Sequence, residues 1–362
     1  MIKRRASKPI SIGNVQIGGG EPVVVQSMTK TDTRDVRATV SQILELEEAG
    51  CEIIRSAVPD MQAAEALAGI RKEIHIPLIA DIHFDYRLAL QALKSGVDGL
   101  RLNPGNIGDP EKVAAVARAA KERGTPIRIG VNAGSLPPLI EKEEGRRKKG
   151  KRQENIAKRM VEVALGQIKL LESLDFDLIK VSLKAFDVPT TIEAYRAMAE
   201  KTHYPLHLGI TEAGPPGTGV IRSAVGIGTL LYLGIGDTIR VSLSGPPAEE
   251  VFAGWEIIKS LNLREKGPVL ISCPSCGRTE VDILSMVSVV EKKLAKMNKN
   301  IKVAVMGCVV NGPGEARAAD VGIACGKARC VLFRRGEILR TIGEGEGVEA
   351  LLKEVESFNE NI

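Results

Sequence analysis

Aromatic side chains are scarce in this sequence. They make up 3% of its 362 residues, with one tryptophan, so Val, Ile, Leu and Ala must fill most of the core. RNA-binding proteins usually stack bases on aromatic side chains or present a broad basic face. The net charge is only +5, so the chain has neither feature in strength. We therefore expect no nucleic-acid partner, and a zinc-stabilised RNA-binding protein is a weak alternative.

Long apolar runs are also missing. No stretch of about 18 apolar residues occurs, so no membrane-spanning helix and no membrane partner are predicted. The basic start, MIKRRASKPI, leads into polar residues and glycines, without the apolar segment and cleavage site of a secretion signal. These absences predict a cytoplasmic protein.

Much of the positive charge is concentrated in one stretch. Residues 141–152 (EKEEGRRKKGKR) hold seven cations against three carboxylates. Such a run is most often a solvated loop. A lid over an anionic substrate and a docking site for an acidic partner are the functional alternatives.

Most of the chain repeats one pattern, in which a short β-branched run is followed by a polar corner and an amphipathic stretch. The runs occupy residues 23–28, 51–56, 77–83, 99–103, 126–132, 178–184, 205–211 and 238–244. Strands alternating with helices over about 250 residues predict an α/β fold, a (β/α)8 TIM-type barrel. Seven or nine units, or an open doubly wound sheet, are alternatives. Before the first run, SIGNVQIGGGEP resembles a hairpin that would plug the bottom of the barrel.

The pattern changes after the eighth run. Residues 247–261 predict the last barrel helix, and a short linker follows. Beyond it come a cysteine pair, a helix at about 279–298, several short strands and a closing helix from Val348. We expect a barrel domain at residues 1–262 and a small α+β domain at residues 263–362.

Cysteines gather in this second domain, which holds five of the six. Disulfides are improbable in a cytosolic chain, so the clustering suggests a metal. Cys273-Pro-Ser-Cys276 places two thiols on one turn, and Cys308 lies in a Gly-rich turn whose exposed amides suit an iron–sulfur cluster. A zinc site with Cys325 or Cys330 as an additional ligand is the alternative. Both of these fall in predicted strands, where a thiol is usually a core residue.

Polar residues occupy alternate positions towards the ends of the predicted barrel strands. In such barrels the carboxyl ends of the strands build the active site. Polar residues two or four apart in a strand share its inward face. The candidate substrate-binding residues are Arg55, Asp81, Arg101, Asn103, Arg128, Asn132, Ser182, Lys184, Arg240 and Ser242, and the candidate catalytic residues are His83 and Glu212.

Cations outnumber acids in this set. Five of the residues are cations, and only Asp81 and Glu212 are acids. One reading is that the inward charges pair with one another and stabilise the barrel. However, unpaired buried cations are costly, so the missing negative charge should arrive with a ligand. A phosphate or diphosphate matches the geometry of guanidinium groups.

Taken together, the motifs resemble one known family. CPSC at 273–276 and GCVVNGPGE at 307–315 are similar to the cluster signature of 4-hydroxy-3-methylbut-2-en-1-yl diphosphate synthases. The segments VVVQSMT, DIHFDYRLA, LRLNPGNIG, IRIGVNAGSL, VSLKAFD, GITEAG and IRVSLSG resemble the barrel of the same family. The resemblance covers essentially the whole chain.

The resemblance implies an iron–sulfur oxidoreductase of the non-mevalonate isoprenoid pathway. Such an enzyme reductively opens and dehydrates 2-C-methyl-D-erythritol 2,4-cyclodiphosphate, using two electrons from reduced flavodoxin or ferredoxin. It implies a [4Fe–4S] cluster held by Cys273, Cys276, Cys308 and Glu315, a catalytic role for Glu315, and Asn311 at the substrate. In this scheme Glu212 gives a proton to the leaving hydroxyl. A barrel transferase with a purely structural cluster is the remaining alternative.

The wiring of the chain predicts an oligomer. The last barrel helix should end at the bottom face, opposite the active site. Linker residues 262–269 span at most about 28 Å, which leaves little length for turning back to the mouth. We therefore expect a head-to-tail homodimer, in which the cluster domain of one chain caps the barrel of the other.

Overall fold

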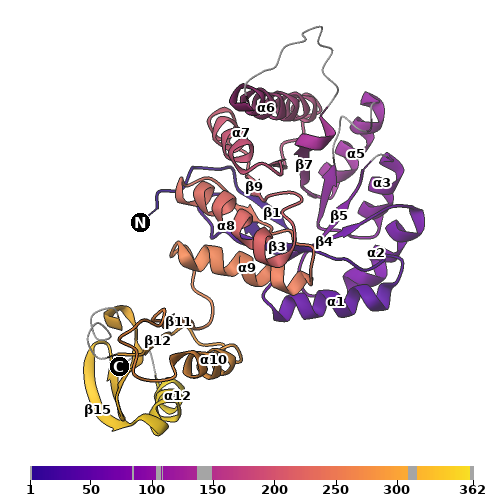
Figure 1. Cartoon of the computed structure of the whole chain (residues 1–362). Helices are drawn as coiled ribbons and strands as arrows, with labels where there is room; N and C mark the ends of the chain where they lie inside the picture. Colours follow the sequence, from indigo (N-terminus) through magenta and orange to yellow (C-terminus); the bar gives the residue numbers. More distant parts are fainter. Residues whose placement is uncertain are drawn as a thin grey trace. The chain divides into compact units, whose positions relative to one another are not determined.

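The computed structural model describes residues 2–83, 85–102, 107, 109–136, 149–308 and 316–358, without the side chains of 149–154. The chain divides into two compact units, Met1–Arg264 and Glu265–Ile362, and each is described by itself (Figure 1). The division falls two residues beyond the predicted domain boundary at 262/263, which stays a prediction.

The first unit is built on a parallel sheet of eight strands, which confirms the predicted barrel. In spatial order the sheet runs β8-β7-β6-β5-β4-β3-β10-β9. A parallel bridge between Val181 and Leu206 links its two ends, so the sheet closes on itself. The strands are β3 Val24–Met28, β4 Ile53–Ala57, β5 Leu78–Asp81, β6 Gly99–Leu102, β7 Ile127–Asn132, β8 Ile179–Lys184, β9 His207–Leu208 and β10 Thr238–Ile239.

Helices alternate with these strands and surround them (Figure 1). They are α1 Val36–Glu48, α2 Met61–Glu73, α3 Tyr86–Lys94, α5 Pro110–Glu122, α6 Lys149–Ser173, α7 Val188–Lys201, α8 Pro216–Tyr232 and α9 Pro247–Ser260; the short 3-10 helix η1 is Ala133–Ser135. Aspartate carboxylates accept backbone N–H groups at several helix starts and so satisfy donors that would otherwise lack a partner. These caps are Asp35, Asp60, Asp85, Asp109 and Asp187.

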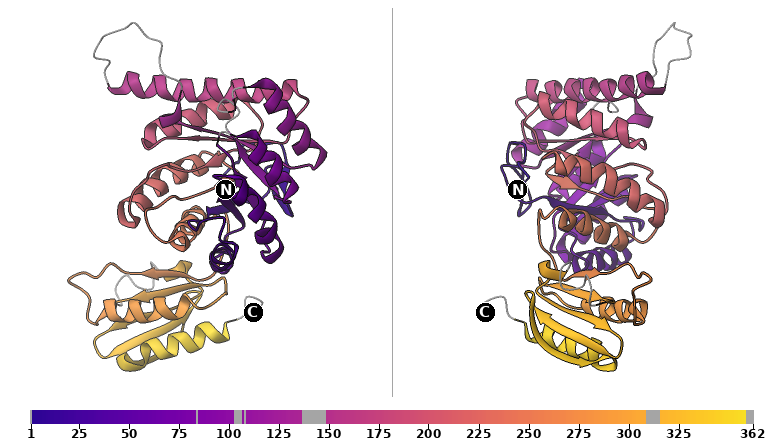
Figure 2. Two further views of the ribbon diagram at one scale, coloured as in Figure 1. Left: turned by 90° about the vertical axis from the view of Figure 1, so that its right-hand side faces the viewer. Right: turned by 60° about the vertical axis from the view of Figure 1, so that its left-hand side comes forward.

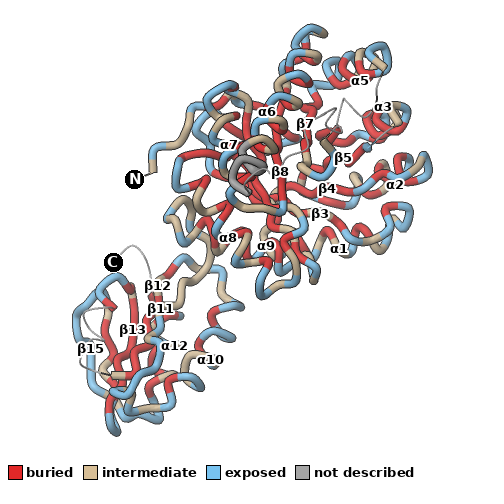
Figure 3. Tube along the Cα trace, turned by 45° about the horizontal axis from the view of Figure 1, so that its top comes forward, coloured by how far each residue is buried: buried red, intermediate tan, exposed pale blue. Residues whose placement is uncertain are grey.

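The two faces of the barrel strands have different surroundings. Outward residues such as Ile54, Leu100 and Val181 are fully buried against the helices in one large apolar core (Figure 3). At the opposite end from the mouth, the predicted hairpin forms as β1 Ile10–Ile12 and β2 Val15–Ile17. Its isoleucines pack against Val24 and other inward residues near the strand starts. The inward positions nearer the mouth are therefore left to polar side chains.

The second unit is a five-stranded mixed sheet with helices packed against it (Figure 2). In spatial order its strands are β11 Val269–Ser272, β12 Lys302–Met306, β13 Val321–Gly326, β14 Arg329–Arg334 and β15 Glu337–Gly343. The first three are parallel and the last two antiparallel. The helices are α10 Ile283–Leu294 and α12 Gly347–Ser357, and the 3-10 turns are η2 Ala316–Ala318 and η3 Glu344–Glu346.

Two features of this unit differ from the expectations. Strand β11 precedes the cysteine turn, in a stretch that the sequence reading treated partly as linker. In addition, Cys325 and Cys330 form a disulfide, although disulfides had been judged improbable. The ladder between β13 and β14 places the two residues directly opposite each other, and both are fully buried. Proximity in the fold, which the sequence does not show, is the reason.

No helix in the described part of the chain is long and apolar enough to cross a bilayer.

Candidate active site

A cavity of about 210 Å3 lies at the mouth of the barrel. Parallel strands all point the same way, so side chains from every part of the sheet can converge there. Its walls are Arg55, Asp81, His83, Arg101, Arg128, Asn132, Ser182, Lys184, Thr211, Arg240 and Ser242. All but Thr211 were predicted from the sequence. Thr211 continues the inward alternation of His207 and Gly209, a signal that could have identified it.

Two glycines make room for cations inside the barrel. A Cβ atom on Gly130 of β7 would lie 2.6 Å from Arg101 Nε. A Cβ atom on Gly209, just after β9, would lie 2.5 Å from Lys184 Nζ. Real Cβ atoms do not approach other heavy atoms so closely. Glycine at these inward positions therefore lets Arg101 and Lys184 reach the cavity.

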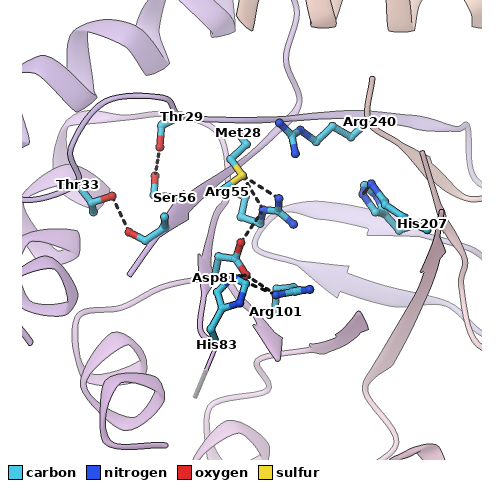
Figure 4. A network of polar contacts seen from close by, with 12 residues as sticks. Met28, Thr29, Thr33, Arg55, Ser56, Asp81, His83, Arg101, His207 and Arg240 are labelled. Atoms are coloured by element: carbon cyan, nitrogen blue, oxygen red, sulfur yellow. Dashed lines mark hydrogen bonds and ion pairs between the residues drawn. The ribbon is translucent and has the colours of Figure 1, made fainter. Parts of the chain in front are cut away.

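Asp81 connects two of the arginines (Figure 4). Its Oδ2 lies 3.5 Å from Arg55 Nε, and its Oδ1 lies 3.2 Å from Arg101 Nη1 and 3.6 Å from His83 Nε2. Burial raises the pKa of Asp81, but the Arg55 charge, the His83 contact and the Arg101 charge outweigh it and lower that pKa. Asp81 is therefore a carboxylate that orients its cationic neighbours.

Arg55 makes a further contact with sulfur. Its Nη2 donates to the thioether of Met28, at 2.8 Å (Figure 4). Burial lowers the pKa of Arg55 to about 10, against the opposing attraction of Asp81. The group still carries its charge near neutral pH, so the cavity keeps a buried positive charge.

Arg128 and Lys184 have no carboxylate in contact among the described residues. Nε and Nη2 of Arg128 are buried without a hydrogen-bond partner. Lys184 Nζ lies 3.3 Å from Nε2 of His207, a buried residue read from the sequence as structural. Burial, followed by the charge of neighbouring arginines, lowers the pKa of both Arg128 and Lys184 well below its ordinary value. These are the groups that an anionic ligand would stabilise most.

Arg240 is paired with a carboxylate that the sequence reading missed. Its Nη2 lies 3.3 Å from Oε2 of Glu250, in the first turn of α9. The expectation that only Asp81 and Glu212 oppose the cations is therefore wrong. Glu250 lies on a helix, and the two-residue alternation of a strand gives no signal for a helix residue that reaches a strand end. Even so, the five predicted cations still exceed the acids that contact them.

Glu212 follows the strand ends but does not line the cavity in this structure. It is exposed, and its backbone has a φ of 55°, in the left-handed region that non-glycine residues rarely adopt. Such conformations cost free energy and cluster at functional positions. The residue is thus held at the mouth by its neighbours rather than by its own preference.

The cysteine turns lie at adjacent strand ends of the second unit. Cys273 follows β11 and Cys308 follows β12, and these two strands are parallel neighbours. The backbone N–H of Gly307 donates to Cys273 Sγ at 3.2 Å. A Cβ atom at Gly307 would lie 2.9 Å from Thr279 Cγ2, so glycine suits this crowded position beside the sulfur.

The surroundings of the exposed Cys276 thiol favour its ionised form. The backbone N–H of Arg278, and then its guanidinium, lower the pKa of this thiol. A thiolate is the form that binds metal. No group of three His, Cys, Asp or Glu side chains in the described part of the chain is already arranged around a metal position. The thiol donors and the N–H directed at sulfur nevertheless fit an iron–sulfur cluster better than an ordinary core.

Some predicted residues cannot be placed. Asn103, Asn311 and Glu315 lie outside the described residues, as does most of the charged stretch, residues 141–148.

A larger hollow of about 500 Å3 lies on the outside of the barrel, between α8 and α9. Its walls are mainly apolar, with Ala224, Phe252 and Ile257 among them. Its charged residues are Glu249 and Glu256, and none of its described walls is a cation. It does not suit a phosphate ligand.

The chain is similar to known proteins over almost its full length. Residues 7–255 match the GcpE TIM-barrel domain, and residues 269–357 match the GcpE protein C-terminal domain. A Dehalococcoides mccartyi protein named 4-hydroxy-3-methylbut-2-en-1-yl diphosphate synthase (flavodoxin) is 64% identical over 99% of this chain and 100% of its own length. A Geobacter sulfurreducens protein of the same name is 56% identical over 97% of this chain and 98% of its own length.

Among solved structures, the barrel is similar to Yersinia pestis dihydropteroate synthase. The TM-score is 0.50 at 11% identity, over 70% of this chain and 98% of that one. At this identity the likeness shows the barrel fold alone.

Proposed function

The chain belongs to the GcpE family of 4-hydroxy-3-methylbut-2-en-1-yl diphosphate synthases, and we propose that its barrel cavity binds the cyclic diphosphate substrate next to a [4Fe–4S] cluster. The enzyme reductively opens 2-C-methyl-D-erythritol 2,4-cyclodiphosphate to the linear hydroxymethylbutenyl diphosphate, in the non-mevalonate pathway. Two electrons and two protons enter, a ring C–O bond breaks, and one hydroxyl leaves as water.

The excess of buried cations at the barrel mouth is the observation that carries the proposed binding site. Arg128 and Lys184 have no carboxylate in contact among the described residues, and Asp81 is shared between Arg55 and Arg101. A doubly charged diphosphate would supply the missing negative charge. Charge-assisted hydrogen bonds from guanidinium groups would also orient it.

Proton delivery is assigned to the mouth of the cavity. Glu212 gives a proton to the leaving hydroxyl, which supports departure of that group as water. Its exposed position beside Thr211, a cavity wall, suits a group that exchanges protons with solvent. His83, hydrogen-bonded within the Asp81 network, helps to orient Arg101 against the substrate, since its Nε2 lies 3.3 Å from Arg101 Nη1.

We assign the cluster to Cys273, Cys276 and Cys308, with Glu315 as its fourth ligand and Asn311 near the substrate. The disulfide occupies Cys325 and Cys330, which speaks against the zinc alternative that needs one of them. When bound, the cluster supplies electrons one at a time and a Lewis-acidic iron. The N–H of Gly307 is directed at the Cys273 sulfur, the kind of hydrogen bond that orients a metal ligand.

The relatives are named for flavodoxin, and we take a reduced flavodoxin as the electron donor here. Ferredoxin, the other carrier considered from the sequence, would serve the same step. We place the enzyme in the cytoplasm, where such carriers and the phosphorylated intermediates are found.

We further propose a head-to-tail homodimer, in which the cluster domain of one chain serves the barrel of the other. Arg264 donates to Glu52 at 2.8 and 2.9 Å and to the carbonyl of Val23 at 2.8 Å, and both residues precede barrel strands. The chain is therefore held at the bottom of the barrel as it leaves the first unit. From Arg264 to Val269, where β11 begins, it can extend at most about 18 Å.

Anaerobic turnover tests the proposed function. Protein purified without oxygen should contain close to four iron and four sulfide per chain, as the cluster type requires. It should convert the cyclodiphosphate when reduced flavodoxin is supplied, and consume two electrons per ring opened. A structural cluster in a transferase would leave the carrier reduced, and that result would refute the redox assignment.

A further inference from the structure

Glu250 is a buried carboxylate to which the proposed mechanism gives no role. The residue is 2% exposed and lies in the first turn of α9, outside the ring of barrel strands. Carboxylates are rarely buried unless they are paired. Its partners lie in the segments that follow the first and last strands of the barrel, so its contacts indicate what it does.

Three groups contact the Glu250 carboxylate. Oε2 lies 3.3 Å from Arg240 Nη2, and Oε1 lies 3.0 Å from Lys30 Nζ. Oε1 also accepts the backbone N–H of Leu243 at 3.0 Å. Lys30 Nζ in turn donates to the carbonyls of Leu243, at 2.9 Å, and Gly245. The carboxylate thus holds the strand-end segment 240–245 and fixes one edge of the Arg240 guanidinium.

Because Glu250 contacts only one edge of the Arg240 guanidinium, the other edge can bind a ligand. Its Nε is buried without a hydrogen-bond partner, and the residue lines the cavity. In Figure 4 the guanidinium points across the mouth towards Met28 and Arg55. An arginine held at one edge loses less conformational freedom when it binds a phosphate with the other.

Lys30 prevents Glu250 from cancelling the charge of Arg240. An isolated Arg240–Glu250 pair would be neutral and would attract a diphosphate weakly. With Lys30 on the second oxygen, one carboxylate is shared by two cations, so the group keeps a charge of +1. Lys30 does not line the cavity, so its influence would be electrostatic and indirect.

We infer that Glu250 is the positioning residue that aims Arg240 at the substrate diphosphate, and that Lys30 keeps this arrangement cationic. The inference rests on the proposed function, because it assumes that the cavity binds the diphosphate. It adds a carboxylate from a helix and a lysine from a loop to a site otherwise built from strand residues.

Substrate affinity of Glu250→Gln holoenzyme tests the inference. The amide keeps the shape but cannot accept from both cations and the Leu243 N–H, so Arg240 loses its anchor. We expect the dissociation constant of the cyclodiphosphate, measured anaerobically without reductant, to rise about tenfold. If Glu250 only neutralised part of the positive charge at the site, its replacement by glutamine would instead strengthen substrate binding. Unchanged or tighter binding would overturn the inference.

Glu249→Gln is the matched control, because Glu249 is the exposed neighbour on the same helix turn. It should bind substrate as the wild type does. Lys30→Met, a change at a partly exposed residue, should weaken binding about threefold in protein that circular dichroism shows to be folded at the assay temperature. If the Glu250 variant did not fold, normal affinity of Lys30→Met would still overturn the inference.

A double mutant separates positioning from general stability. If Glu250 acts through Arg240, Glu250→Gln should add nothing to the loss caused by Arg240→Ala. A further loss in that background would contradict the inference. Wild-type affinity in Arg240→Ala would instead refute the diphosphate site itself. Lost affinity in Arg240→Ala with normal affinity in Glu250→Gln would refute the positioning role alone.

Discussion

Individual side chains at the barrel mouth carry charges that the fold leaves incompletely paired. Asp81 is held as a carboxylate by Arg55 and Arg101, whereas Lys184 contacts only the neutral acceptor of His207 among the described groups. Burial and the charges of Lys184 and Arg128 keep the pKa of His207 well below its ordinary value, so it cannot compensate by taking a second proton. Protonation of Lys184 should therefore depend on the ligand.

Substrate binding should raise the pKa of Lys184, so that near the free-site pKa it is coupled to proton uptake. Burial, then the arginine charges, lowers the pKa of Lys184 in the free site, and an ionised diphosphate raises it again. Affinity should therefore fall as the pH rises through the free-site pKa of Lys184, by up to about tenfold per pH unit. Calorimetry in two buffers of different ionisation enthalpy measures the proton uptake. Lys184→Met should abolish it and the surface change Lys201→Met should not; equal uptake in Lys184→Met would assign the proton elsewhere.

The cysteines should fall into two classes. Cys273→Ser, Cys276→Ser and Cys308→Ser should each lose the cluster, because every thiolate is a ligand in the proposed set. Cys325→Ser should keep its iron, since that sulfur is bonded to Cys330 within the core. Iron and sulfide content of anaerobically purified protein, together with its absorbance, distinguishes the classes. Loss of iron in Cys325→Ser would show that the ligand set is wrong.

At the scale of the elements, the parallel strands set which side chains share the cavity. Adjacent strands pair Arg101 with Arg128 and Asn132 with Lys184 in register. So many large polar side chains fit inside the barrel only because some neighbouring inward positions are glycines, which have no side chain. The glycines at 130 and 209 are therefore part of the site, although they carry no functional group.

Gly130→Ala should damage substrate binding without touching the substrate. The new methyl group would lie 2.6 Å from Arg101 Nε, so the guanidinium must move. We expect a loss of about 1.5–3 kcal/mol in binding free energy, the scale of a charged hydrogen bond. Gly134→Ala is the control, because a Cβ there meets no atom within 4 Å. Equal affinities for the two variants would show that Arg101 tolerates the shift or does not bind substrate.

At the scale of the whole molecule, two units must cooperate in one reaction. The first supplies the cavity, and the second supplies the cysteines. Electron transfer to a bound substrate requires the two sites to meet. In the proposed head-to-tail dimer, a second copy of the chain supplies the missing half.

Mixing two inactive variants tests the shared site. Glu212→Gln should keep its cluster and bind substrate but turn over slowly, because the proposed proton donor is gone. Cys308→Ser should lack the cluster. When subunits exchange, each mixed dimer contains one intact composite site, so activity should return to up to about half of the wild-type value per mixed dimer. Demonstrated exchange without recovered activity would mean that each chain completes its own site.

The order of strands and helices could be read from the sequence, because local patterns determine it. Alternating β-branched runs and amphipathic stretches predicted every barrel strand, and the inward positions followed from the two-residue period. The same two-residue period identified every cavity wall except Thr211. Cys273 and Cys276 were visible as a motif because they share one turn, and Cys308 because of the Gly-rich turn around it.

Contacts between distant segments were decided only by the tertiary structure. Glu250 reaches Arg240 from a helix, and Lys30 joins it from the segment that follows the first barrel strand. The pairing of charges depends on distances of a few ångströms, which no periodicity encodes. The sequence by itself therefore determined most of the groups that face the cavity. Only the packed fold decided that Glu212 lies outside its lining, which of the charges neutralise one another, and which remain for a ligand.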